Sequence, residues 1–135
     1  MTTTTMAIIS IVLMIFAGIC NSVMDVLKTR YNTSLFAKWK HQNWLKPSLS
    51  WRNKWKDGDS KKCEKFPVSS TVFVWITDFW HLAKMLMLVS IAFSIIFYSP
   101  IVKWWIDWFI LYCAFTIPFE IFYSRIWTKK QNNPA

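Results

Sequence analysis

The residues of this sequence whose types and spacing suit chemistry are polar side chains that interrupt long apolar segments. Asn21 and Asp25 stand four residues apart, and Asp78 and His81 stand three apart. Because residues three or four apart share one face of a helix, each pair can present its two side chains together. Glu120 interrupts a third apolar segment. A charge inside an apolar segment is costly unless it is paired or solvated, so these positions are candidates for a site.

The Asp-x-x-His pair supports two kinds of chemistry. Its carboxylate and imidazole can bind one divalent metal ion, or the carboxylate can hold the imidazole in one tautomer for acid–base work. If other acids converge on the pair, the group can also accept protons. The candidate catalytic residues are therefore Asp25, Asp78, His81 and Glu120, and the candidate metal ligands are Asp25, Asp78 and His81.

Two plainer interpretations stay open for the same residues. Asn21, Asp25, Asp78 and His81 can form a polar cluster that fixes helix packing, or nearby basic side chains such as Lys28 can satisfy the acids as ordinary ion pairs. The sequence contains no glycine-rich phosphate loop, no G-x-S-x-G and no H-E-x-x-H motif. No specific reaction is therefore indicated.

The chain that must position these residues is short and strongly apolar. Its 135 residues are 54% hydrophobic and 19% aromatic, with ten tryptophans and eleven phenylalanines. A soluble domain of this length cannot bury so many large apolar side chains, so lipid is expected to cover some of them. The three cysteines are odd in number and far apart, which favours neither a disulfide framework nor a zinc site.

Three apolar segments predict an all-α protein with three transmembrane helices in a single membrane domain covering residues 1–135. The spans are expected at about 6–26, 69–98 and 101–125. The first lacks a basic leader and a small-residue cleavage site, so we interpret it as a retained anchor. The second is too long for a perpendicular span and is expected to be one helix whose first turns lie in the interface. A very short connection then predicts an antiparallel hairpin with the third span, and Pro118 predicts a kink there.

The segment between the first two spans, about 28–66, is basic and rich in tryptophan. It carries eleven basic and three acidic residues between positions 28 and 65. Tryptophans interleaved with cations are typical of a segment at the level of lipid headgroups. The same pattern occurs on surfaces that bind single-stranded nucleic acid, but a membrane interface explains it without that partner, so we expect no nucleic acid. We expect anionic lipid as a partner. The candidate headgroup-binding residues are Lys38, Lys40, Arg52, Lys54 and Lys56.

Three spans place this basic loop and the basic tail, 125–135, on the same side of the membrane. The positive-inside rule then predicts an external N-terminus and a cytoplasmic C-terminus in the cell membrane, which is the inner membrane if the source is Gram-negative. The loop would be an interfacial, cytoplasmic element. Asn21, Asp25, Asp78, His81 and Glu120 would all lie near that side.

Three short segments carry a resemblance. Asn21 to Asp25, Ser50-Trp51-Arg52-Asn53-Lys54-Trp55, and Asp78-Phe79-Trp80-His81 after a serine–threonine run are similar to segments of a group of small uncharacterised bacterial and bacteriophage membrane proteins. That group shares Asn-x-x-x-Asp, Ser-Trp-x-Asn-Lys-aromatic and Asp-x-Trp-His, and the similarity covers roughly the first two thirds of the chain. It implies a membrane protein and no particular activity. It adds weight to Asn21, Asp25, Asp78 and His81.

Three functional hypotheses remain. The leading one is a non-enzymatic membrane component that acts through helix packing, with itself or with another membrane protein, while its basic loop holds lipid headgroups. The alternative is an interfacial enzyme, metal-dependent or acid–base, that acts on a lipid headgroup. The third is a holin-like pore former. The one cofactor that the sequence suggests is a divalent metal ion.

Overall fold

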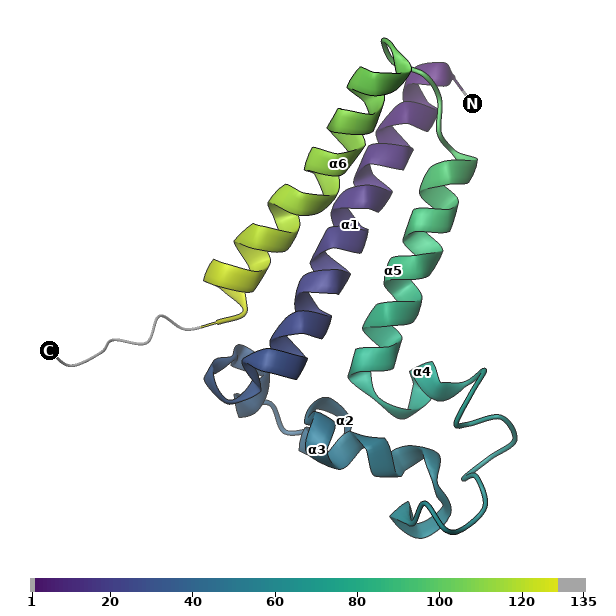
Figure 1. Ribbon diagram of the computed structural model, residues 1–135, viewed down its shortest axis with the longest axis vertical. Coiled ribbons are helices and arrows are strands. Elements are labelled where there is room, and N and C mark those ends of the chain that lie inside the picture. Colours follow the sequence, from purple (N-terminus) through teal and green to yellow (C-terminus); the bar gives the residue numbers. More distant parts are fainter. Residues whose placement is uncertain (1, 129–135) are drawn as a thin grey trace, which may run out of the picture.

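The computed structural model describes residues 2–128. Its three long helices are α1 (Thr3–Thr29), α5 (Phe79–Ile96) and α6 (Trp104–Ile121), and the shorter α2 (Gln42–Leu45), α3 (Pro47–Ser50) and α4 (Val74–Thr77) gather at one end (Figure 1). Single 3-10 turns lie at Tyr31–Thr33, Leu35–Lys38, Trp51–Lys54 and Lys56–Gly58, and a π-helix, Phe122–Ile126, continues α6. The described residues form no β-strand, and the predicted all-helical class is confirmed.

Three helices are long and apolar enough to cross a membrane, as predicted. They cover Thr3–Thr29, Phe79–Ile96 and Trp104–Ile126. The first starts earlier than expected because the side chain of Thr2 caps it, accepting a hydrogen bond from the Thr5 amide. The third runs through Pro118 without ending. The basic tail predicted from 125 onward lies outside the described residues beyond position 128.

The second apolar segment differs from the expectation of one continuous helix. It is broken at Asp78, whose backbone is extended, with α4 ending at Thr77 and α5 beginning at Phe79. The break has a local cause, because the Asp78 carboxylate accepts a hydrogen bond from the His81 amide and so caps α5. The short helix α4 therefore precedes the apolar helix α5 as a separate element.

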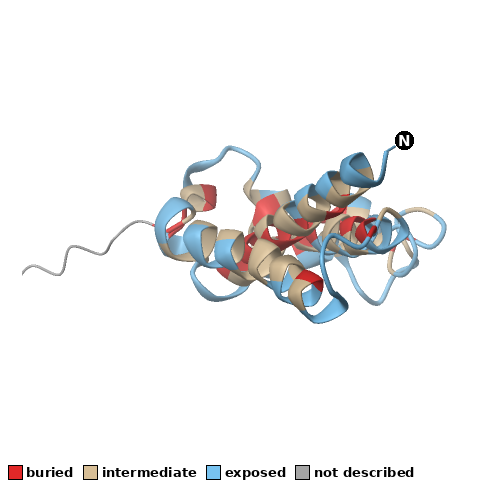
Figure 2. Ribbon diagram, turned by 90° about the horizontal axis from the view of Figure 1, so that it is seen from above, coloured by how far each residue is buried: buried red, intermediate tan, exposed pale blue. Residues whose placement is uncertain are grey.

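Helix α1 is the central element of the bundle and contacts both α5 and α6, which flank it (Figure 1). It runs parallel to α6 and antiparallel to α5. Small residues allow the close approach, since a Cβ on Gly18 would lie 2.1 Å from the Phe115 carbonyl oxygen. On the other side, the hydroxyls of Ser10 and Ser94 hydrogen-bond at 2.9 Å. Buried residues accordingly follow the middle of the bundle and exposed ones its outside (Figure 2).

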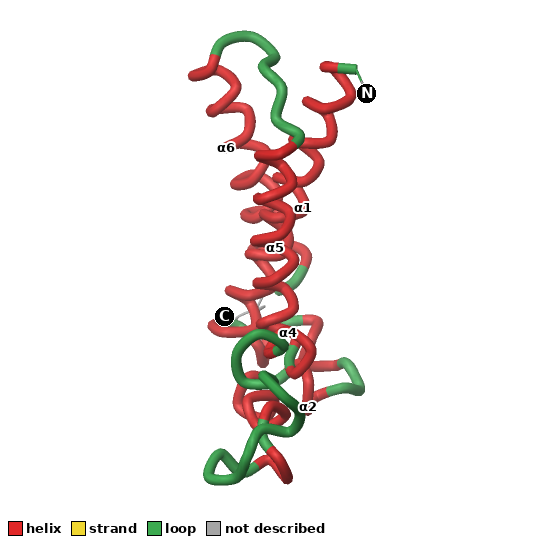
Figure 3. Tube along the Cα trace, turned by 90° about the vertical axis from the view of Figure 1, so that its right-hand side faces the viewer, coloured by secondary structure: helices red, strands yellow, loops and turns green. Residues whose placement is uncertain are grey.

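The two ends of the bundle are built differently, as the trace in Figure 3 shows. The loop end, where residues 30–77 lie, holds the hydrophobic core. Its buried members are Val23, Met24, Val26, Leu27, Phe36, Leu45 and Ala83. The hairpin end is the connection 97–103 between α5 and α6. It is fastened by Asp107, whose buried carboxylate accepts hydrogen bonds from the Tyr98 hydroxyl and the Ile101 and Val102 amides.

Candidate functional site

A pocket at the loop end brings together side chains from three parts of the chain. Its volume is about 290 Å³. We call it the interfacial pocket, and it is lined by Lys28, Pro47, Ser50, Trp51, Lys54, Asp78, Trp80 and His81. Lys28 comes from the end of α1, Asp78, Trp80 and His81 from the start of α5, and the others from the loop. The pocket thus joins the predicted Asp–His pair to two cations.

The Asp78–His81 pair is the central polar contact of this pocket. One carboxylate oxygen, Oδ2, lies 2.6 Å from Nδ1 of the imidazole, and the other, Oδ1, accepts the backbone N–H of His81 at 2.9 Å. The Asp78 side chain is 4% exposed, whereas that of His81 is 30% exposed. The buried carboxylate therefore orients an imidazole that remains open to the pocket.

Two tryptophans of the pocket, Trp51 and Trp80, each have a basic side chain over the indole ring. The ring of Trp80 meets the imidazole of His81 edge to face at 4.9 Å, and the Lys84 ammonium lies 5.4 Å from the Trp80 ring centre. The guanidinium of Arg52 lies over Trp51 at 5.6 Å. Both cations thus lie against tryptophan rings that line the pocket. The one acid that lines the pocket, Asp78, therefore shares it with two lysines, Lys28 and Lys54.

Side-chain hydrogen bonds to backbone carbonyls fasten the loop to α4, the short helix just before α5. The Asn53 amide nitrogen donates to the carbonyls of Thr77, at 2.9 Å, and Asn43, at 2.7 Å. The Trp44 indole donates to Ile76, and the Ser69 hydroxyl donates to the Lys54 carbonyl. These bonds span residues distant in sequence, and they hold Lys54 beside the Asp–His pair.

The outer part of the loop closes around Glu64. Its carboxylate accepts hydrogen bonds from the Val68 amide at 2.9 Å, from the Ser70 amide at 3.1 Å and from the Ser70 hydroxyl. The Ser70 hydroxyl, and after it these amides, hold the pKa of Glu64 below its ordinary value of 4.5. The ionised form of Glu64 thus organises the turn that returns the chain to α4.

The other predicted site residues do not join the interfacial pocket. Asn21 and Asp25 lie half-buried on α1, and Glu120 is exposed on α6. Across residues 2–128 the ion pairs are Lys62–Asp57 and His81–Asp78. Neither Asp25 nor Glu120 therefore forms the expected ion pair with a basic side chain in that range. Within the same range no three His, Cys, Asp or Glu side chains lie close enough to share a metal ion. The predicted convergence of acids from all three spans is therefore not observed.

The predicted headgroup-binding residues divide into two groups. Lys54 is half-buried and lines the interfacial pocket. The remaining four, Lys38, Lys40, Arg52 and Lys56, are exposed on the loop. The structure therefore separates one cation inside a defined cavity from a diffuse basic surface around it.

Sequence reasoning assigned no binding role to two polar residues of the pocket or to one acid elsewhere. Lys28 was considered an ion-pair partner and Ser50 was not singled out, yet both line the cavity. Asp107 was not among the predicted site residues, yet it is 1% exposed and accepts three hydrogen bonds. Asp107 follows a connection that contains Pro100 and lies among tryptophans. That position could have indicated an acid in the first turn of a helix.

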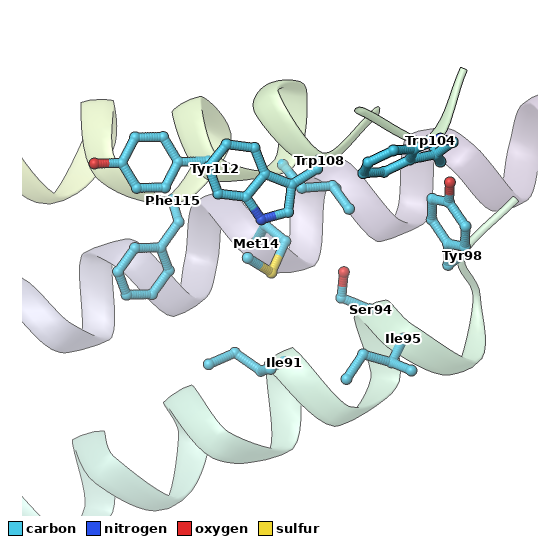
Figure 4. A pocket seen from close by; sticks show the side chains of 10 residues that line it. Met14, Ile91, Ser94, Ile95, Tyr98, Trp104, Trp108, Tyr112 and Phe115 are labelled. Atoms are coloured by element: carbon cyan, nitrogen blue, oxygen red, sulfur yellow. The ribbon is translucent and has the colours of Figure 1, made fainter. Parts of the chain in front are cut away.

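A second and larger cavity lies between α5 and α6 and has a different character (Figure 4). Its volume is about 660 Å³, and Met14 of α1 lies at its base, with Ile91 of α5 on one wall and Trp108 of α6 on the other. The residues lining it carry no charge, and the hydroxyl of Ser94 already bonds Ser10. This groove offers apolar volume, whereas the interfacial pocket offers groups that can bind an anion or transfer a proton.

The chemistry of the interfacial pocket follows from its parts. Lys28 and Lys54 can bind an anionic group, and the imidazole of His81 can accept or donate a proton while Asp78 orients it. Trp51 and Trp80 add apolar walls beside these polar groups. No protein-family model matches this chain, and neither a curated protein nor a solved structure shows significant similarity to it.

Proposed function

We propose that this chain is a membrane protein that binds the phosphate of an anionic lipid headgroup in the interfacial pocket. The observation that carries the proposal is the meeting of Lys28 and Lys54 with the Asp78–His81 pair at the loop end of three helices apolar enough to cross a membrane. Phosphate is the anionic group common to membrane lipids, and lysine binds it as a compact point charge.

The level of the pocket in the membrane supports this ligand. Lys28 is the basic residue of the last turn of α1, and Asp78 and His81 begin α5, so the pocket lies where both helices leave their apolar segments. Trp51, Trp80 and the loop tryptophans are suited to the zone of headgroups. In the orientation we propose, with the N-terminus outside and the loop in the cytoplasm, the pocket opens toward the anionic cytoplasmic leaflet.

The form of the pocket also distinguishes it from a diffuse basic surface. A cavity of about 290 Å³ has room for a headgroup phosphate and part of its glycerol, but not for a whole lipid. The acyl chains would then remain in the surrounding bilayer. Binding is expected to depend on the two pocket lysines more than on the exposed cations of the loop.

The test is binding of short-chain phosphatidic acid to the full-length protein in detergent, measured by isothermal titration calorimetry. We expect Lys28→Gln combined with Lys54→Gln to weaken binding by at least about tenfold, because a hydrogen bond to a charged group contributes about 1.5–3 kcal/mol. Lys38→Gln combined with Lys40→Gln removes the same charge from the exposed loop. It should change affinity less than about threefold.

Two outcomes would overturn the proposal. Equal weakening by both double variants would mean that charge on the loop surface, and not the pocket, attracts the lipid. Equal binding of a short-chain diacylglycerol, which lacks the phosphate, would mean that the headgroup is not recognised. Circular dichroism of each variant checks that the helices are retained.

A further inference from the structure

The interfacial pocket contains a group that lipid binding alone does not use. Two lysines are sufficient to hold a phosphate, yet His81 lines the same cavity with its ring positioned by a buried acid. The N-cap function of Asp78 needs one oxygen, Oδ1. The second oxygen, Oδ2, contacts Nδ1 of the imidazole at 2.6 Å. The arrangement therefore does more than begin a helix.

The contact with Asp78 determines which ring nitrogen of His81 is reactive. A carboxylate accepts hydrogen bonds, so Nδ1 carries the proton and Nε2 carries the free electron pair. Within residues 2–128 no hydrogen bond is made to Nε2, and the side chain of His81 is 30% exposed. The geometry thus presents an oriented, accessible nitrogen nucleophile beside two cations.

Phosphoryl transfer is the reaction that this set of groups fits. Its transition state spreads negative charge over the phosphate oxygens, and catalysis depends mainly on positioning and on cations. Lys28 and Lys54 supply the cations, and Asp78 stabilises the positive imidazole that forms when Nε2 gains a bond to phosphorus. Asp78 is buried, and its Oδ2 contacts the ring directly.

We propose that the interfacial pocket removes the phosphoryl group from a lipid phosphate monoester, with His81 as the nucleophile. The inference rests on the proposed binding of a lipid phosphate. Nε2 of His81 attacks phosphorus, the bond from phosphorus to the lipid oxygen breaks, and the proton of the monoanionic phosphate moves to the departing oxygen, which leaves as an alcohol. Water then attacks phosphorus, the P–N bond breaks, and His81 returns to its neutral form as dihydrogen phosphate departs.

Two residues act on this step in different ways. His81 is the catalytic residue, because it touches the reacting phosphorus. Asp78 is a positioning residue that acts through the ring. Asp78→Asn keeps a good N-cap and so should retain α5, but it no longer stabilises the positive imidazole. Its expected effect is a fall in the rate of phosphate release with little change in lipid affinity.

The experiment uses full-length protein reconstituted in phosphatidylcholine vesicles that contain phosphatidic acid labelled with ³²P on its phosphate. The readouts are release of inorganic phosphate and ³²P on the protein after an alkaline quench, which preserves phosphohistidine. We expect label on His81 and a loss of release of about a thousandfold in His81→Gln. His41→Gln, which changes the other histidine of the chain, is the matched control and should behave as wild type.

Calorimetric binding of short-chain phosphatidic acid is measured on the same preparations, which separates the two proposals. Wild-type protein that binds phosphatidic acid but neither releases phosphate nor carries label would overturn the phosphoryl transfer and leave lipid binding intact. If the wild-type protein does not bind phosphatidic acid, both the lipid binding and the phosphoryl transfer are overturned. Phosphate release that persists in His81→Gln, with the helices retained, would also reject His81 as the nucleophile.

Discussion

The loop end and the hairpin end of the bundle are stabilised by different means. At the loop end, α1, α5, the loop and the end of α6 share a hydrophobic core, and side-chain hydrogen bonds tie the loop to α4. At the hairpin end, an apolar groove lies between α5 and α6, and one buried acid, Asp107, holds their connection. The groups suited to chemistry lie at the end that has the core.

The contrast has a physical reason. A site needs side chains whose positions are held by their neighbours, and a core that includes large aromatic residues holds them. Helices surrounded by lipid gain little from hiding apolar surface from one another, since lipid covers that surface equally well. Exposed side chains such as Ile95, Trp104 and Trp108 on α5 and α6 fit this account.

The largest effect is expected from a change in the core of the loop end. Phe36 is 1% exposed and packs against Phe79 and Trp127, so Phe36→Ala should lower the free energy of unfolding by about 3–5 kcal/mol. The matched change, Phe109→Ala, affects a ring that is 58% exposed on α6 and should cost less than about 1 kcal/mol. Denaturant unfolding in detergent, followed by tryptophan fluorescence, measures both. Similar losses for the two variants would contradict the distinction between the buried core of the loop end and the exposed surface of α6.

An intermediate effect is expected at the hairpin end. Asp107→Ala leaves the amides of Ile101 and Val102 and the hydroxyl of Tyr98 without their acceptor, which should cost about 2 kcal/mol. Tyr98→Phe removes one of these three bonds and should cost about 1 kcal/mol. Hydrogen exchange is expected to rise in residues 97–103 while the amides of the loop end stay protected. Spread of the increased exchange to the loop end would show that the two ends unfold together.

The smallest effect is expected in the outer turn of the loop, where Glu64 is hydrogen-bonded to Ser70. Because the folded pKa of Glu64 lies below its ordinary value of 4.5, its stabilising effect is complete above that value and is lost as the pH falls through the folded pKa. Proteolytic cleavage within residues 56–70 should therefore become faster in acid. Glu64→Gln should be cleaved at that faster rate already at neutral pH. A cleavage rate independent of pH in wild type would contradict this role. The core residues should remain protected throughout.

Much of the fold was predictable because apolar length is read directly from the sequence. The runs that begin near Met6 and Ile101 are long enough to span a membrane, and the structure forms a helix over each of them. The break at Asp78 was not predictable in the same way. The pattern Asp-x-x-His is compatible with two side chains on one face of a helix and also with an Asp that caps the start of a helix. In the structure the backbone of Asp78 is extended, so Asp78 is the N-cap of α5.

The candidate site was predictable only in part. Asp78 and His81 were identified because their spacing is local, and the structure places them in contact. Asp25 and Glu120 were expected beside them because all lie near the same end of their helices. Depth alone does not bring side chains together, however, since rotation of each helix about its axis decides which face meets which.

The sequence by itself therefore determined the helical class, the three apolar helices, the basic loop and the local pair of Asp78 with His81. The tertiary structure alone decided that α1 is central, that Asp107 is buried, and that Lys28 and Lys54 share a pocket with that pair. The reason is the range of the interactions. The apolar segments and the helix caps depend on residues that are neighbours in the sequence. The pocket depends on hydrogen bonds such as that from Asn53 to Thr77, which form once distant segments have packed.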